Sequence, residues 1–283
     1  MTHGASETVR FQTPEGMTLV GDRWGKSSGT PVLLLHGGGQ TRHSWGRTAH
    51  TLAGKGCYCV SLDLRGHGDS DYAREADYRI DSFVRDISHV ASSFSLPPVL
   101  VGASLGGIIC LLFAGESHGN VASGLVLVDV APRVEDAGVE RILSFMQSHQ
   151  EGFLSLDEAA LAVSQYLGHR SPPEDLKGLE KNLRRGADGR FHWHWDASLL
   201  TDFNMAEARN ERRFYAAAQA LTIPMLLVRG LLSDVVSQDV VNEFFEAVPQ
   251  ARHVDISGAA HTVAGDSNQA FTQAVVDFIE EIS

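Results

Sequence analysis

The stretch that decides the fold is Val99-Leu100-Val101-Gly102-Ala103-Ser104-Leu105-Gly106-Gly107-Ile108-Ile109. Its first residues form an apolar run that predicts a buried strand, and apolar residues at helical spacing over 108–112 predict a helix after it. Between the two stands the pattern G-x-S-x-G. A serine in a sharp turn from strand to helix occupies a strained backbone position, and the glycines around it leave room for the turn. We therefore expect the Ser104 hydroxyl to project from the carboxyl end of a sheet.

The rest of the chain repeats this alternation of strand and helix. Apolar runs predict further strands at 8–12, 19–24, 31–35, 58–64, 124–130, 224–228 and 251–256, and helical periodicity predicts helices near 44–53, 80–94, 238–247 and 267–282. Such alternation indicates an α/β fold with a mostly parallel sheet and right-handed crossovers. In sheets of this kind, ligand sites form at the carboxyl ends of the strands. The loops after residues 35, 64, 101, 228 and 256 should therefore meet at one edge.

One long segment interrupts the alternation. Residues 133–220 contain helical pieces, a Ser-Pro-Pro break at 171–173 and a glycine turn at 186–189, but no convincing buried strand. We interpret this segment as a helical cap inserted after the sixth strand. The expected domains are thus a core formed by residues 1–132 and 221–283, and a cap formed by residues 133–220.

Composition limits the function classes. Hydrophobic residues make up 43% of the chain, the formal net charge is −12, and no block of Lys or Arg occurs. This balance argues against nucleic acid and anionic membrane surfaces as partners. No apolar run is long enough to span a membrane, and residues 1–10 lack the apolar core of a signal peptide. The three cysteines read as free buried thiols, so we expect a cytoplasmic protein.

A serine hydroxyl needs a base to take its proton and a third group to orient that base. His261 follows the last strand in the run Gly-Ala-Ala-His, and Asp234 lies just past the penultimate strand. The order Ser104, Asp234, His261 is the order found in hydrolases with this serine turn. Asp129, at the end of the sixth strand, is the alternative acid. His253 is the alternative base, but it falls inside the last strand.

An oxyanion formed at the attacked carbon needs two converging N–H donors. The Leu105 N–H is one candidate, because it follows the nucleophile directly. The run His36-Gly37-Gly38-Gly39 supplies the other, and we favour Gly38, where no side chain blocks the approach of a ligand.

These motifs together resemble the α/β-hydrolase fold family. The matching residues are His36-Gly37, Asp63-x-Arg65-Gly66-x-Gly68-x-Ser70, Gly102-x-Ser104-x-Gly106, Gly230 with Asp234, and His261. The resemblance covers nearly the whole chain outside the insertion, and is closest to the capped branch of esterases, lactonases, perhydrolases and C–C bond hydrolases. It implies an eight-stranded sheet with helices on both faces, a serine triad and no cofactor. Epoxide hydrolases and haloalkane dehalogenases of this fold carry an aspartate where Ser104 stands, so those chemistries are disfavoured.

Large apolar residues in the insertion predict an apolar substrate pocket. We expect the pocket to be lined by Trp45, Phe145, Trp193, Trp195, Leu231 and Val263. His192 and His194 lie two apart, but two histidines without a third ligand make a weak metal site, so no metal is expected.

The leading hypothesis is a serine esterase that cleaves a small to medium, largely apolar ester or lactone through an acyl-enzyme, acting as a monomer or homodimer. C–C bond hydrolysis or perhydrolysis in the same site is the first alternative. A ligand-binding protein on the same scaffold is an alternative of another class.

Overall fold

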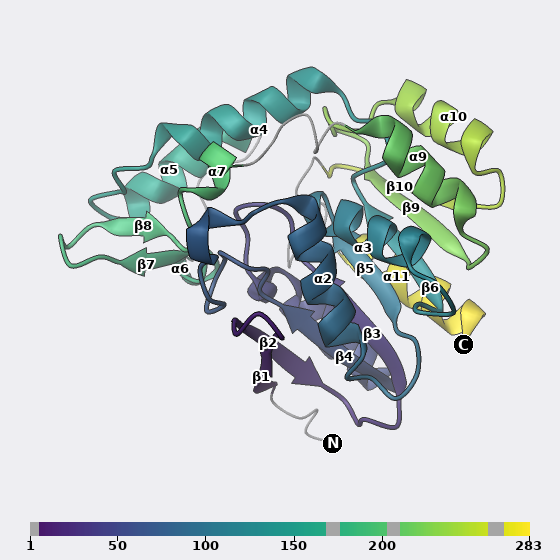
Figure 1. The fold of residues 1–283 in the computed structure, drawn as a ribbon. Helices are drawn as coiled ribbons and strands as arrows, with labels where there is room; N and C mark the ends of the chain where they lie inside the picture. The colour runs from purple at the N-terminus through teal and green to yellow at the C-terminus, as the bar shows by residue number, and fades with distance from the viewer. Residues whose placement is uncertain (1–5, 168–175, 203–209, 260–268) are drawn as a thin grey trace.

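The computed structural model describes residues 6–167, 176–202, 210–259 and 269–283 (Figure 1). Its centre is an eight-stranded sheet in the order β1-β2-β4-β3-β5-β6-β9-β10. The first two strands run antiparallel to their neighbours, and all other pairs are parallel. The strands are β1 (Glu7–Gln12), β2 (Thr18–Trp24), β3 (Thr30–Leu35), β4 (Cys57–Leu62), β5 (Val99–Ala103), β6 (Gly124–Val128), β9 (Met225–Gly230) and β10 (Arg252–Ile256).

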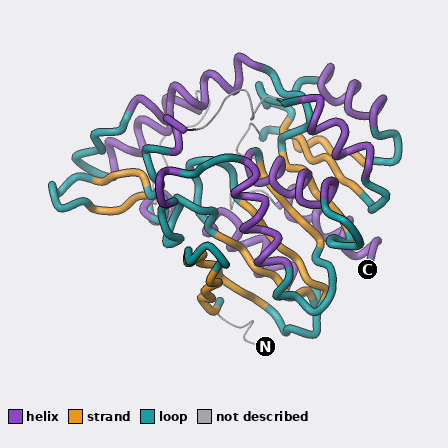
Figure 2. The backbone as a smooth tube through the Cα atoms, viewed as in Figure 1, coloured by secondary structure: helices purple, strands orange, loops and turns teal. Residues whose placement is uncertain are grey.

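Helices cover both faces of this sheet, as Figures 1 and 2 show from the front. One face carries α2 (Ile80–Ala91), α3 (Leu105–Glu116), α9 (Glu211–Ala220) and α10 (Gln238–Ala247), and the other carries α1 (Gly46–Gly54) and α11 (Gln269–Ile282). Two short 3-10 helices, η1 (Arg42–Trp45) and η2 (Arg74–Ala76), lie in the loops that follow β3 and β4.

The continuous apolar runs follow from this double cover. In β3, Leu33 and Leu35 pack into the core on the face of α2 and α3, and Val32 and Leu34 pack into the core on the other face. All four side chains are buried, because a parallel strand between two helical layers has no solvent face. The predicted fold class, a mostly parallel α/β sheet with helices on both faces, is confirmed.

The insertion between β6 and β9 forms a cap over the carboxyl ends of the strands (Figure 1). It contains a two-stranded antiparallel hairpin that the sequence analysis missed. Each hairpin strand is only three residues long and none is continuously buried, so neither produces the apolar run of a core strand. The elements of the insertion before α9 are α4 (Asp136–Ser148), α5 (Leu156–Leu167), α6 (Lys177–Glu180), β7 (Leu183–Arg185), β8 (Phe191–Trp193) and α7 (Leu199–Asp202).

Helix α9 lies inside the predicted cap boundaries but packs against α3 of the core. The contact is close: a Cβ added to Gly115 of α3 would stand 2.4 Å from the backbone oxygen of Ala217. The division into a core of residues 1–132 and 221–283 and a cap of 133–220 stays a prediction, with α9 as the helix that joins the two.

None of the described helices combines the length and the apolar character that crossing a membrane requires. The three cysteines, Cys57, Cys59 and Cys110, are buried and free.

Candidate active site

Ser104 stands at the turn between β5 and α3, with φ 47° and ψ −117°. Residues other than glycine rarely adopt this backbone conformation, so the surrounding structure must hold Ser104 in it. A Cβ added to Gly102 would lie 2.4 Å from the Gly106 oxygen, and one added to Gly106 would lie 2.5 Å from the Leu35 oxygen. Both close approaches are to backbone atoms, which cannot rotate away. The glycines of the G-x-S-x-G pattern are therefore required by the packing of the turn.

The loop after β3 approaches this turn. A Cβ on Gly37 would stand 3.3 Å from the Ser104 Cβ. Gly37 N–H donates to Gln40 Oε1 at 3.3 Å and Gly39 N–H donates to His67 Nε2 at 3.1 Å. Among the described residues, Gly38 N–H has no acceptor, and it lines the same cavity as Ser104.

Leu105 begins α3, so its N–H has no intrahelical acceptor. The structure thus brings Gly38 and Leu105, the two predicted oxyanion donors, to one cavity with their N–H groups not used in secondary structure. Donors in this state can bind a developing negative charge without first breaking a bond.

Two buried histidine rings stand behind the loop of residues 37–40. His36 Nδ1 bonds Gly37 O at 2.8 Å and its Nε2 accepts from Leu64 N at 3.0 Å. The ring of His67 meets it edge-on, with centroids 4.9 Å apart. Burial is the main reason that the pKa of His36 is lowered to about 4 and that of His67 to about 3. Both rings are therefore neutral at neutral pH and act as fixed donors and acceptors.

A cavity of about 470 Å³ lies between the sheet edge and the cap. Ser104 is at its base, and Phe145, Trp193 and Trp195 of the insertion form part of its wall. Its lining is mainly apolar and, among the described residues, includes no Lys or Arg. Pockets of this size and character suit small, largely apolar organic ligands.

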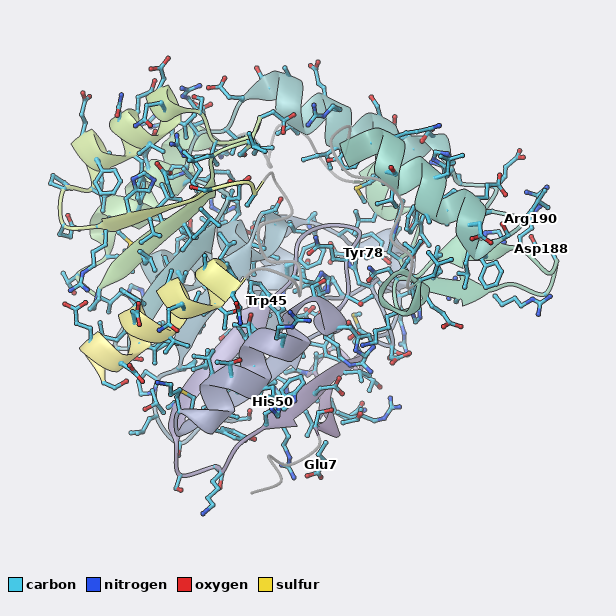
Figure 3. All side chains as sticks on the ribbon, turned by 180° about the vertical axis from the view of Figure 1, so that it is seen from behind. Glu7, Trp45, His50, Tyr78, Asp188 and Arg190 are labelled. Carbon is cyan, nitrogen blue, oxygen red and sulfur yellow. The ribbon has the colours of Figure 1, made fainter. Side chains whose placement is uncertain are left out.

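Two of the predicted pocket residues lie elsewhere. Trp45 is fully buried on the opposite face of the sheet, where its ring packs 5.9 Å from that of Phe271 in α11 (Figure 3). Trp45 ends η1 directly before α1, and its side chain packs into the core beneath α1 and α11 instead of lining the cavity. Leu231 is half exposed at the end of β9 and does not line the cavity. Val263, also predicted, lies outside the described residues.

Asp234, the predicted acid, lies beyond β9 with its carboxylate directed to the cap. Its Oδ2 stands 2.6 Å from Arg141 Nη2 of α4, and its side chain is 31% exposed. A partly exposed ion pair of this type contributes modestly to stability. The contact joins the core to the cap.

Asp129 is the acid that the sequence analysis set second. It follows β6 directly, has φ 50° and is fully buried. Ser104 N–H donates to Val128 O at 3.1 Å. Asp129 therefore directly follows the residue of β6 that bonds to the nucleophile. Its carboxylate accepts from Gly230 N–H at 3.1 Å and from Ser233 Oγ–H at 2.6 Å. A signal in the sequence for this residue is its place at the end of a buried strand beside the serine strand.

His261, the predicted base, lies outside the described residues. His253, the alternative base, is in β10, where its Nε2 lies 2.8 Å from Asp255 Oδ1. That contact is part of a partly buried cluster in which Arg229 also pairs with Asp255.

Two buried ion-pair networks support the loops around the site. Arg42 pairs with Asp63 and, at 2.8 Å, with Asp69, and Arg65 pairs with Asp86 through two hydrogen bonds of 2.6 and 2.8 Å. Each arginine is held by at least one buried carboxylate, so the two pairs brace the loops that follow β3 and β4. Within the described ranges, no group of three His, Cys, Asp or Glu side chains could hold a metal ion.

Comparisons with known proteins agree with this fold. A family model described as the alpha/beta hydrolase fold matches residues 30–267. The chain is 29% identical over 272 residues to the esterase Rv0045c of Mycobacterium tuberculosis, covering 89% of this chain and 83% of that protein. It is 26% identical over 271 residues to the 3-hydroxybutyrate-oligomer hydrolase of Cupriavidus necator, covering 89% and 90%.

The fold also matches a crystal structure of an alpha/beta hydrolase from Novosphingobium aromaticivorans. The TM-score is 0.84 at 24% identity, and the match covers 99% of both chains. From its sheet, its serine turn and its family match, this chain belongs to the α/β-hydrolase fold family.

Proposed function

We propose that this protein is a serine hydrolase that cleaves a small to medium, uncharged and largely apolar carboxylic ester or lactone. The similarity to an esterase and to a hydroxybutyrate-oligomer hydrolase supports the reaction class. The observation that carries the proposal is Ser104, held at φ 47° at the base of an apolar cavity beside two N–H donors that secondary structure does not use.

In the proposed mechanism, His261 takes the Ser104 proton as Oγ attacks the substrate carbonyl. The new oxyanion binds the N–H groups of Gly38 and Leu105. His261 then returns the proton to the leaving alcohol, which departs and leaves an acyl-enzyme. Water, activated by the same histidine, hydrolyses the acyl group and restores Ser104.

Two aspartates compete for the role of orienting acid. Chain order favours Asp234, whereas burial and register favour Asp129. A carboxylate that orients an imidazole works best when it is shielded from water and fixed by other donors, as Asp129 is. We therefore favour Asp129 and keep Asp234 as the alternative.

The cavity wall supports the proposed substrate class. Its apolar lining favours the transfer of acyl or alcohol carbons from water at about 0.8 kcal/mol per CH₂ group. The carboxylates of Asp136 and Glu211 are the charged groups of the described lining. They disfavour a substrate that carries its own negative charge. The cytoplasmic location stays a prediction from cysteine usage.

The test is a panel of neutral esters, lactones and β-diketones assayed with wild type and Ser104→Ala. We expect ester or lactone turnover in the wild type and a loss of about 10⁴–10⁶-fold in kcat for the variant. Ser117→Ala, at the other end of α3, is the matched control and should keep full activity. Turnover of esters by Ser104→Ala close to that of the control would contradict the proposal. Cleavage of β-diketones alone would move it to C–C bond hydrolysis.

A further inference from the structure

The loop of residues 66–68 is one of the places where the core contacts the cap. Gly68 N–H donates to His194 O at 2.7 Å, and Asp196 N–H donates to Gly66 O at 2.8 Å. The two bonds form an antiparallel bridge that places His67 opposite Trp195. Trp195 lines the cavity above Ser104. A short piece of cap backbone is thus paired with the loop that carries His67.

Tyr78 adds a side-chain bond to the same joint. Its hydroxyl donates to Asp196 Oδ2 at 2.6 Å and accepts from Ala73 N–H at 3.1 Å. The ring is almost fully buried between the core and the cap (Figure 3). The position of the cap segment therefore depends on a core residue that does not itself line the cavity.

The His67 ring extends from the loop of residues 66–68 to the oxyanion loop, residues 36–41. It is fully buried, and its Nδ1 lies 3.0 Å from Arg65 O. Because a carbonyl oxygen only accepts, Nδ1 carries the proton, and Nε2 is free to accept from Gly39 N–H at 3.1 Å. The ring links two backbone segments with one fixed tautomer.

Gly39 is also in contact with the cap. It has φ 77°, and a Cβ at this position would stand 3.2 Å from Met146 Cε and 3.8 Å from Trp195 Nε1. The Gly38 N–H is therefore held in place from both sides. Before it, Gly37 N–H bonds to Gln40, and after it, Gly39 N–H bonds to His67. Movement of either anchor would turn the Gly38 N–H away from the cavity.

We propose that His67 is a positioning residue that couples the seating of the cap to the geometry of the oxyanion hole. The cap fixes residues 66–68, residues 66–68 fix the His67 ring, and the ring fixes Gly39. This inference rests on the proposed function, since it assigns the Gly38 N–H to the oxyanion. As a consequence, a substrate that holds the cap against residues 66–68 also holds the Gly38 N–H in the position that binds its oxyanion.

The first experiment compares His67→Leu with His67→Gln. Leucine removes the acceptor for Gly39 N–H, whereas the amide oxygen of glutamine can replace it. Complete removal of one oxyanion donor costs about 10²–10³-fold in kcat, so a displaced donor should cost about 10–100-fold. We expect this loss for His67→Leu with KM changed less than about threefold, and substantial recovery in His67→Gln.

A second readout separates positioning from general damage. A trifluoromethyl ketone forms a tetrahedral adduct with the serine and places its oxyanion in the hole. Its affinity for His67→Leu should fall by the same factor as kcat/KM. A loss confined to KM, or ketone affinity equal to that of the wild type, would overturn the proposal.

The third experiment tests the cap directly. Tyr78→Phe should lower kcat in the wild type but add no further loss in His67→Leu, because the ring that transmits the effect is gone. Tyr72→Phe is the matched control: it lies in the same loop region, and its buried hydroxyl has no partner among the described residues. Additive losses for Tyr78→Phe and His67→Leu would contradict the coupling.

Hydrogen exchange gives a readout that needs neither activity nor a stable His67 variant. Exchange at the oxyanion loop, residues 36–41, should be faster in Tyr78→Phe than in the wild type and unchanged in Tyr72→Phe. Equal exchange in all three proteins would overturn the inference. An absence of Ser104-dependent hydrolysis in the wild type would instead contradict the proposed function, and the exchange result would still decide the coupling.

Discussion

Asp129 and Asp234 both follow strands that end near the nucleophile, but their carboxylates have different surroundings. Asp129 is fully buried with two hydrogen-bond donors from the β9 loop, and Asp234 is partly exposed and paired with Arg141 of the cap. At the scale of single residues, this contrast decides what each substitution should do.

We expect Asp129→Asn to lower kcat by about 10⁴-fold, because an amide in this place stabilises the wrong histidine tautomer and cannot stabilise an imidazolium. Asp234→Asn should cost less than about tenfold, through its contact with the cap. Both variants are to be compared by steady-state kinetics on one ester. The reverse order of losses would restore Asp234 as the acid.

The residue types of the site could be predicted from the sequence, but the partners of each residue could not. Gly38 and Leu105 follow from the spacing of glycines and serine, and the structure brings both to the Ser104 cavity. The choice between Asp129 and Asp234 depends on how deeply each is buried and on the pairing of Asp234 with Arg141, 93 residues away. No local sequence pattern indicates either feature. Trp45 was misplaced because an aromatic residue near a site motif gives no sign of which sheet face it packs on.

At the scale of elements, the turn from β5 to α3 depends on close backbone packing. Gly106→Ala should destabilise the fold by more than about 2 kcal/mol and reduce labelling of Ser104 by a fluorophosphonate, because the new Cβ would meet the Leu35 and His36 oxygens. Gly46→Ala is the matched control. That site has open space and begins α1, so alanine should be neutral or slightly stabilising. Urea unfolding of both variants measures the difference, and equal stability would contradict this account of the turn.

Long elements were predictable because their apolar periodicity extends over several turns or a whole strand. Helix α10 has the bounds that the periodicity indicates, and β4 ends two residues earlier than expected. At this point the Asp63 carboxylate accepts from Arg42 N–H and Asp69 N–H, and these bonds fix the start of the loop that follows β4. Hairpin β7-β8 was missed because its pairing depends on contacts within the cap and not on a buried strand.

At the scale of the whole molecule, two neutral buried histidines make stability depend on pH. In the unfolded chain a histidine takes up a proton below about pH 6.5, whereas burial lowers the pKa of His36 to about 4 and of His67 to about 3. The unfolded state then binds more protons, so the free energy of unfolding falls as the pH drops below 6.5. Each histidine should remove about 2 kcal/mol between pH 7 and pH 5.

Urea unfolding of the wild type at a series of pH values measures this loss. His67→Gln has no imidazole at this position, so between pH 7 and pH 5 it should lose about 2 kcal/mol less than the wild type. Parallel curves for the wild type and this variant would show that protonation of His67 is not coupled to unfolding.

The most direct test of the central claim is to trap the acyl-enzyme. The wild type is mixed with an activated ester, quenched in acid within the first turnover, digested and analysed by mass spectrometry. The account predicts an acyl group on Ser104 in the wild type and none in Ser104→Ala. Ester hydrolysis with no acylated Ser104, or an acyl group carried by another residue, would contradict it.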